Sequence, residues 1–285
     1  MTDRPAGALV LVGTPIGNLG DLSPRAVEEL RTADVIAAED TRRTRGLLTH
    51  AGIPAGRRLR AVHARNEATA AERIVGEIRG GDRVAVVTDA GMPGISDPGA
   101  QLVRACLDAG LRVEAVPGPS AVLTAVVLSG LPSDRFVFEG FLPRKGRART
   151  ERLAGLAGEP RTTVLFEAPN RVRATLADLA AVCGPQRPVA VARELTKAFE
   201  EMWRGTLAGA ARHVERTEPR GEHVVVVGPA PEREPPSDAE IEAAVRAALA
   251  DGRSARDAAS DVADALGVAR RRAYEAATRL KPARR

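Results

Sequence analysis

Short apolar runs alternate with amphipathic stretches through the first part of the chain. The apolar runs predict strands at 8–12, 33–37, 59–62, 83–88 and 112–116. Helical periodicity is expected at 24–32, 41–51, 66–80 and 98–109. Ser23-Pro24 and Asp97-Pro98 each place an N-capping residue before a proline, which is typical of a helix start. This alternation predicts a mainly parallel sheet covered by helices, in a first α/β domain over residues 1–130.

A second α/β domain is expected over residues 131–229. Its predicted strands are 135–141, 162–167, 188–193 and 222–228, with helices near 148–157, 169–182 and 206–217. Strands outnumber helices here, so the pattern favours a mixed sheet over a doubly wound one.

The pattern changes again after residue 229. A proline-rich linker is expected at 230–236, followed by a helical domain at 237–285. Ser237 with Glu240, and Ser254 with Asp257, have the spacing of capping boxes. Gly267 suits the tight turn of a helix-turn-helix. Two interpretations stay open for this domain, namely contact with nucleic acid or packing on the body of the protein.

Composition is that of an ordinary globular protein, with 285 residues, 44% hydrophobic and 28% charged. No stretch approaches the roughly 20 apolar residues of a membrane span, and the N-terminus lacks a signal-peptide pattern. We therefore expect a cytoplasmic protein with no membrane partner. The net charge is +5, and residues 270–285 hold seven basic residues against one acid. Such a basic tail favours contact with a phosphate backbone.

Metal chemistry receives no support from the sequence. Cys106 and Cys183 stand alone in helix-like segments, so each is expected to be a buried structural thiol rather than part of a disulfide or a metal ligand. The four histidines show no metal-ligand spacing.

Three glycine- and proline-rich loops carry most of the functional information. They are 13–18, 88–94 and 117–121, and each follows an apolar strand-like run. Ligands of open α/β sheets bind at the carboxyl ends of the strands, and prolines stiffen the loops there. None of the loops matches a P-loop or the G-x-G-x-x-G pattern, which disfavours kinases and dinucleotide dehydrogenases. The loops therefore predict a rigid pocket lined by backbone.

The motifs, taken in order, resemble the tetrapyrrole-methylase-like family of S-adenosylmethionine-dependent methyltransferases. Within that family they look like the bacterial enzymes that methylate a cytidine 2′-hydroxyl of small-subunit ribosomal RNA. The resemblance is carried by VGTPIGNLGD (12–21), AAEDTR (37–42), TDAGMPGISDPG (88–99), PGPSA (117–121), GLPSDRF (130–136), EGFLP (139–143), FEA (166–168), ARELTK (192–197) and GEHV (221–224). It implies two α/β domains with the cofactor in a cleft between them, together with the helical tail.

The resemblance also assigns residues to S-adenosylmethionine. Asp89 would complement its positive charge, and Ser120 would donate a hydrogen bond to its carboxylate. The full implied set is Pro15, Gly17, Thr88, Asp89, Ala90, Pro93, Ser120, Ala121, Phe166, Glu167 and Leu195.

The implied reaction is methyl transfer to the ribose of a decoding-centre cytidine, cytidine 1402, in 16S ribosomal RNA. A ribose hydroxyl is a weak nucleophile, so a nearby base should help. The candidates for the base or a positioning group are Glu39, Asp40, Glu194 and Lys197. Two other interpretations stay open. In one, Glu39 and Asp40 cap the helix that begins at Thr41. In the other, Arg193 and Lys197 form an ion pair at the domain interface.

Basic side chains are expected to hold the RNA. The candidates are Arg42, Arg43, Arg144, Lys145, Arg270, Arg271 and Arg272, although a solvated loop also explains 144–145. The expected partner is 16S ribosomal RNA or the assembled small subunit, and the resemblance implies a homodimer.

Two rival functions remain. One is a methyltransferase of the same fold that acts on a small molecule such as a tetrapyrrole, which would not need the basic helical tail. The other is an RNA-binding factor without catalysis, which would be favoured by loss of the pocket glycines or Asp89.

Overall fold

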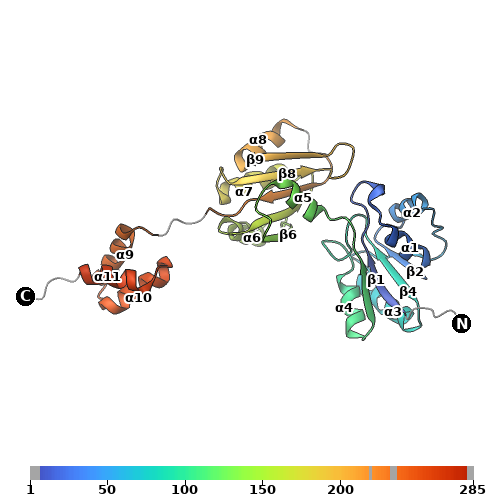
Figure 1. The fold of residues 1–285 in the computed structure, drawn as a ribbon, viewed down its shortest axis with the longest axis horizontal. Coiled ribbons are helices and arrows are strands. Elements are labelled where there is room, and N and C mark those ends of the chain that lie inside the picture. Colours follow the sequence, from blue (N-terminus) through green and yellow to red (C-terminus); the bar gives the residue numbers. More distant parts are fainter. Residues whose placement is uncertain (1–6, 218–219, 232–235, 281–285) are drawn as a thin grey trace, which may run out of the picture. The chain divides into compact units, whose positions relative to one another are not determined.

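The first half of the chain builds a five-stranded parallel sheet in the order β3-β2-β4-β1-β5 (Figure 1). The computed structural model describes residues 7–217, 220–231 and 236–280. The strands are β1 (Ala8–Val12), β2 (Val35–Ala38), β3 (Leu59–Ala61), β4 (Arg83–Val87) and β5 (Arg112–Val116). The predicted parallel sheet is confirmed.

Helices cover both faces of this sheet. α1 (Pro24–Thr32) and α2 (Thr41–His50) pack on one face, and α3 (Glu67–Arg79) and α4 (Ala100–Asp108) pack on the other. A short 3-10 turn, η1 (Leu19–Asp21), precedes α1. Side chains of a strand alternate between faces, so Val10 of β1 joins the α1 layer while Leu9 joins the α3 layer.

Helix capping explains where these helices begin. α1 starts as predicted, with the Ser23 hydroxyl accepting a hydrogen bond from the Ala26 amide at 3.1 Å. The predicted start at Pro98 with Asp97 as cap is wrong, because α4 begins at Ala100. The buried carboxylate of Glu67 instead accepts from the amides of Gly99 and Gln101, at 2.8 and 2.9 Å. A cap from another helix leaves no local pattern in the sequence.

The second sheet is mixed, as predicted, in the order β6-β7-β10-β8-β9. Its strands are β6 (Phe136–Phe141), β7 (Thr162–Glu167), β8 (Pro188–Arg193), β9 (Glu201–Thr206) and β10 (His223–Val227). β6 and β7 are parallel, while β7, β10, β8 and β9 pair antiparallel. The edge strand β9 was not predicted.

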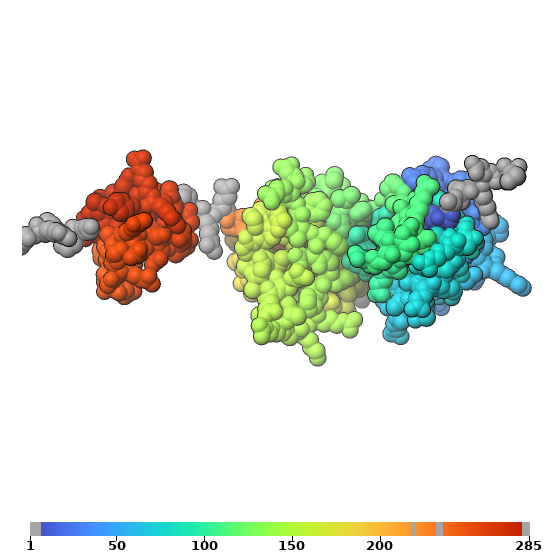
Figure 2. All heavy atoms as spheres, turned by 90° about the horizontal axis from the view of Figure 1, so that it is seen from below, coloured from blue at the N-terminus to red at the C-terminus, as the bar shows by residue number. Residues whose placement is uncertain are grey.

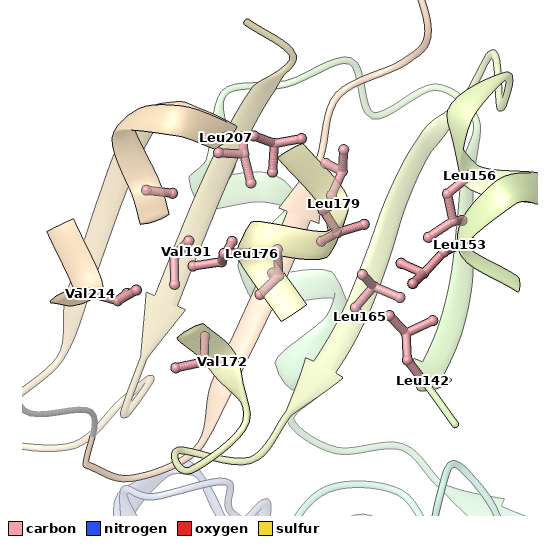
Figure 3. Packing of buried hydrophobic residues seen from close by; sticks show 14 residues of the cluster. Leu142, Leu153, Leu156, Leu165, Val172, Leu176, Leu179, Val191, Leu207 and Val214 are labelled. Carbon is pink, nitrogen blue, oxygen red and sulfur yellow. The ribbon is translucent and has the colours of Figure 1, made fainter. Parts of the chain in front are cut away.

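Three helices cover one face of the second sheet. They are α6 (Arg147–Ala157), α7 (Val172–Cys183) and α8 (Leu207–Arg216). Figure 3 shows Leu153, Leu176 and Leu207 from these helices packing with strand residues Leu165 and Val191. This is the core of the second half.

A further helix, α5 (Ala121–Ser129), covers the other face and was not predicted. Val122, Ala125 and Val126 of α5 are buried in a cluster with residues of β7, β8 and β10. Ile16, from the loop after β1, belongs to the same cluster. This apolar cluster therefore contains residues of both halves of the chain.

The C-terminal residues form a second compact unit, divided from the first at residue 231. Its helices are α9 (Asp238–Ala250), α10 (Ala255–Leu266) and α11 (Arg270–Leu280), drawn in orange and red in Figure 2. The capping box of Ser237 and Glu240 is present, and Gly267 turns the chain between α10 and α11 at φ +64°. The helical domain expected here is thus observed, while linker residues 232–235 and the basic residues of 281–285 lie outside the described residues.

None of the helices in the described ranges is long and apolar enough to cross a membrane.

Candidate functional site

The loops after β1, β4 and β5 pack backbone against backbone. The Gly13 amide donates to the Val116 carbonyl at 2.9 Å, and Thr14 and Gly91 exchange two backbone hydrogen bonds at 2.9 and 3.1 Å. A Cβ atom on Gly13 would lie only 2.6 Å from the amide nitrogen of Gly118. The close approach requires glycine at this position, and the three loops form one fixed cluster, which we call the loop cluster.

One hydroxyl in the loop cluster lacks a partner. Thr88 is 3% exposed, and its Oγ1 makes no hydrogen bond with any described residue. Its carbonyl, by contrast, accepts from the Thr14 hydroxyl at 3.1 Å. A buried polar atom without a partner costs free energy, so Thr88 marks a position where a polar ligand group would be stabilised.

The second half of the chain closes on this cluster through residues 194–197. The amide of Asn18 donates to the Thr196 hydroxyl at 3.1 Å, and a Cβ atom on Gly17 would lie 2.4 Å from Cγ of Lys197. Glu194 and Thr196 both adopt positive φ, at +51° and +66°. Non-glycine residues in this conformation are strained, and such strain gathers at functional sites.

The structure brings together most of the residues assigned to the cofactor. Ala90, Ala121, Phe166 and Leu195 share the apolar cluster that contains residues of both halves. Pro15 and Pro93 are buried in the loops after β1 and β4, with Gly17, Thr88 and Asp89 on the same two loops. Ser120 caps α5, and its hydroxyl accepts from the Leu123 amide at 3.4 Å.

Glu167 is placed apart from that group. It follows Phe166 on β7, so its side chain points to the opposite face of the sheet. There the carboxylate accepts from the Thr175 hydroxyl at 2.6 Å and pairs with Arg171 at 3.2 Å. These contacts anchor α7 and use both carboxylate oxygens.

The carboxylates of this site, which belong to Glu39, Asp89, Asp97 and Glu222, give the loop cluster a negative electrostatic field. The Asp89 amide donates to Oε2 of Glu39 at 3.2 Å, and Oδ1 of Asp89 accepts from the Asp40 amide at 3.2 Å. Burial raises the pKa of Asp89, although the charge of Arg43 opposes this. The same effect, assisted by the charges of Glu39, Asp89 and Glu222, raises the pKa of Asp97 to about 7. Asp97 was not predicted as a site residue, because its Asp-Pro step suggested a helix cap.

The other acidic and basic candidates have defined partners. Asp40 caps α2 by accepting from the Arg42 amide at 2.8 Å, and this hydrogen bond lowers its pKa. Lys197 pairs with Glu194 at 2.9 Å and lies 3.6 Å from Glu222. The hydrogen bond from Lys197 lowers the pKa of Glu194.

The arginines and lysine assigned to RNA differ in their surroundings. Arg42, Arg144 and Lys145 are exposed, and Arg42 pairs weakly with Asp40 at 3.4 Å. Arg43 lies 3.4 Å from Asp89. In the C-terminal unit, Arg272 donates to Asp238 and to the Pro236 carbonyl. Exposure alone therefore does not distinguish an RNA contact from a structural one.

The family model described as tetrapyrrole (corrin/porphyrin) methylases matches residues 8–211. The chain belongs to the tetrapyrrole methylase family. It is a methyltransferase, as the motifs after β1, β4 and β5 indicated.

Curated relatives are named ribosomal RNA small subunit methyltransferase I. The relative from Xylella fastidiosa strain Temecula1 is 55% identical over 223 residues, 78% of this chain and 81% of its own. The Synechocystis relative is 44% identical and covers 96% of this chain and 99% of its own. The Mycobacterium tuberculosis H37Rv relative is 47% identical, and the alignment covers 95% of this chain and 94% of its own.

Solved structures share the fold of this methylase. The methyltransferase CobJ superposes with a TM-score of 0.58 at 22% identity, covering 80% of this chain and 96% of its own. Uroporphyrin-III C-methyltransferase from Thermus thermophilus, complexed with S-adenosyl homocysteine, superposes with a TM-score of 0.54 at 19% identity. The superposition covers 78% of this chain and 97% of that enzyme. About a fifth of this chain lies outside each of these superpositions.

Proposed function

We propose that this methylase transfers a methyl group from S-adenosylmethionine to the ribose 2′-hydroxyl of cytidine 1402 in 16S ribosomal RNA. The observation that carries the proposal is the similarity to small-subunit ribosomal RNA methyltransferases, which extends over 94–99% of the length of two relatives. An alignment over 95–96% of this chain extends into the C-terminal helices. It therefore favours RNA over a tetrapyrrole as the substrate.

The residues of the loop cluster fit S-adenosylmethionine. Its positive sulfonium would be stabilised by the field of Glu39, Asp89 and Asp97. The unpartnered Thr88 hydroxyl offers a hydrogen bond to a polar group of the cofactor. Apolar side chains, including Phe166 and Leu195, would line its adenosine portion.

Methyl transfer is a displacement in which the bound cofactor supplies the electrophilic methyl group. The ribose hydroxyl that accepts the methyl group would give up its proton to a base of this chain. We assign that proton to Asp97. No hydrogen bond or ion pair to its carboxylate occurs among the described residues, and a pKa of about 7 suits proton uptake at neutral pH. Glu39 remains the alternative acceptor, whereas the lowered pKa of Asp40 makes it a weaker base.

Lys197 has a positioning role in this proposal. Its ammonium is held between Glu194 and Glu222, and its side chain lies against Gly17 of the first loop. The exposed side chains of Arg42, Arg144 and Lys145 would hold the RNA backbone beside the loop cluster.

We also infer a homodimer in the cytoplasm. Helix α5 exposes Leu123 and Val127, which are 55% and 76% exposed and lie one turn apart. A second copy would cover this apolar face. Sedimentation velocity of the wild type should give a dimer, and Val127→Glu should give a monomer; a wild type that sediments as a monomer would contradict the inference.

The experiment that tests the proposed function is transfer of tritium from methyl-labelled S-adenosylmethionine. Three acceptors are compared: naked 16S ribosomal RNA, assembled small subunits and uroporphyrinogen III. We expect label in RNA or subunits, and mass spectrometry of the digested RNA should place it on the ribose of one cytidine. Label in the tetrapyrrole alone would establish the rival function, and binding of RNA without transfer would support the noncatalytic one.

A further inference from the structure

We propose that a hollow between α10 and α11 of the C-terminal unit is a binding subsite for one unpaired nucleotide of RNA. The inference rests on the proposed action on ribosomal RNA and adds a specific site to it. The hollow measures about 530 Å³ and is lined by Arg256, Ala259, Ser260, Arg270, Arg271 and Tyr274. Its size lies within the roughly 300–1,000 Å³ typical of ligand pockets.

The helical repeat explains why the hollow exists. Arg256, Ala259 and Ser260 are spaced to lie on one face of α10, because residues three and four apart are neighbours on a helix. Arg270, Arg271 and Tyr274 share a face of α11 for the same reason. Alanine and serine are short, so the longer arginine and tyrosine side chains stand around a recess.

Three of the arginines of the C-terminal unit line this hollow. Residues 236–280 contain seven arginines and eight carboxylate side chains, so this described part of the unit has no net positive charge. Arg272 and Arg279 are paired with carboxylates of α9, Asp238 at 2.7 Å and Glu242 at 3.0 Å. The basic cluster at 270–272 that the sequence indicated is therefore divided by the structure, with Arg272 serving the fold.

The three arginines of the hollow, Arg256, Arg270 and Arg271, are held less firmly by carboxylates than Arg272 and Arg279 are. Arg270 is 3.7 Å from Asp264, and Arg271 pairs with the exposed Glu275 at 2.9 Å. No carboxylate lies within 4 Å of the Arg256 guanidinium among the described residues. Exposed ion pairs of this kind contribute little free energy, so a phosphate can replace them at small cost.

Tyr274 supplies the feature that favours a nucleotide over a simple anion. It is the chain's one tyrosine, and the residue is 53% exposed and lines the hollow. An aromatic ring beside arginines matches a base and its flanking phosphates, since the base stacks on the ring while guanidinium groups bind phosphate. The Ser260 hydroxyl can hydrogen-bond to ribose or base.

The test uses the full-length protein, and the probe is naked 16S ribosomal RNA in a filter-binding assay over a series of salt concentrations. Tyr274→Ala should weaken binding by about five- to 150-fold, the usual effect of losing one base stack. Tyr274→Phe should bind as the wild type does, because it keeps the ring. The pair Arg256→Gln and Arg270→Gln should weaken binding and reduce the salt slope by about 0.7 per lost phosphate contact.

Arg246→Gln is the matched control, since Arg246 is an exposed arginine on α9 outside the hollow. It should leave affinity unchanged, and all variants should bind S-adenosylmethionine equally in calorimetry. Equal RNA affinity of wild type and Tyr274→Ala would overturn the nucleotide subsite, as would equal weakening by Arg246→Gln and the hollow variants. Wild-type protein that methylates no RNA at all would instead overturn the proposed function.

Discussion

At the scale of single residues, Asp97 is the group whose environment departs furthest from what its local sequence suggested. A capping aspartate would accept amide hydrogen bonds, and its pKa would fall. Here Glu67 caps α4 instead, and Asp97 is left partly buried beside other carboxylates. Its raised pKa follows from that placement, which depends on contacts between distant segments.

Asp97→Asn is expected to lower kcat/KM for RNA by about 10²–10⁴-fold, the usual contribution of a general base. A base acts when deprotonated, so the wild-type rate should rise with pH and level off above about pH 7. The variant should lose this rise. Glu222→Gln is the comparison: it removes a negative neighbour and should move the rise to lower pH without lowering the plateau. A rise that persists in Asp97→Asn would assign the proton to another group.

The same residue predicts how stability depends on pH. The carboxyl pKa is about 7 in the folded chain and 3.8 in the unfolded chain, so folding disfavours its ionised form. Its stabilising contribution is present below pH 3.8 and is lost as the pH rises through 7. The Tm of Asp97→Asn should therefore exceed that of wild type by more at pH 7.5 than at pH 4.5. An equal difference at both pH values would contradict the raised pKa.

Glu67 offers a test of the cap supplied by another helix. Its carboxylate accepts from the amides of Gly99 and Gln101, and Glu67 is 5% exposed. Glu67→Ala would leave these amides without an acceptor and should lower the free energy of unfolding by about 1–3 kcal/mol. Glu67→Gln keeps one oxygen acceptor and should lose less. Urea unfolding measures both variants, and equal losses would show that the amides find other acceptors.

At the scale of elements, the loop cluster depends on close approach of backbones. Gly13→Ala would place Cβ 2.6 Å from the Gly118 nitrogen and 2.8 Å from the Met92 sulfur. It should weaken S-adenosylmethionine binding at least about tenfold, or 1.4 kcal/mol, in calorimetry. Gly46→Ala is the matched control, because Gly46 lies within α2 and nothing lies within 4 Å of its added Cβ. That change should instead stabilise the fold by about 0.5–1 kcal/mol.

Elements with a clear hydrophobic periodicity could be predicted from the sequence, whereas helix α5 and strand β9, which lack one, could not. The strands of the first sheet and the helices that cover it followed from alternation and capping residues. Helix α5, with the sequence AVLTAVVLS, carries apolar residues on both its buried and its exposed face, so it shows no helical stripe. Strand β9, EMWRGT, has neither a regular alternation nor an apolar run.

The candidate site, like the fold, could be predicted in part from the sequence. The glycine loops and most residues assigned to the cofactor lie together, because the loops follow neighbouring parallel strands. Asp97 and the opposite-facing Glu167 could not be placed, because one depends on tertiary burial and the other on the register of β7.

At the scale of the whole molecule, the two compact units have very different cores. In the first, leucine, isoleucine and valine form most of the buried set, with alanines as a minority. In the C-terminal unit, alanines form most of the buried set, and the larger members are Ile241, Val245 and Val262. A small unit that buries mainly methyl groups gains little hydrophobic free energy.

Differential scanning calorimetry should therefore show two transitions, with the C-terminal unit unfolding at the lower temperature. Residues 1–230 alone should show the upper transition only. S-adenosylmethionine should raise the upper transition, because ligands stabilise the state they bind. One transition in the full chain that moves as a whole with the cofactor would show that the two units unfold together.

The alanine core has a consequence for the working temperature of the enzyme. If RNA is held by the C-terminal unit, warming should reduce the occupancy of RNA well before it reduces that of the methyl donor. KM for RNA would then climb steeply over a range in which KM for S-adenosylmethionine stays flat. The upper temperature limit of ribosomal RNA methylation would be set by three small helices rather than by the catalytic core.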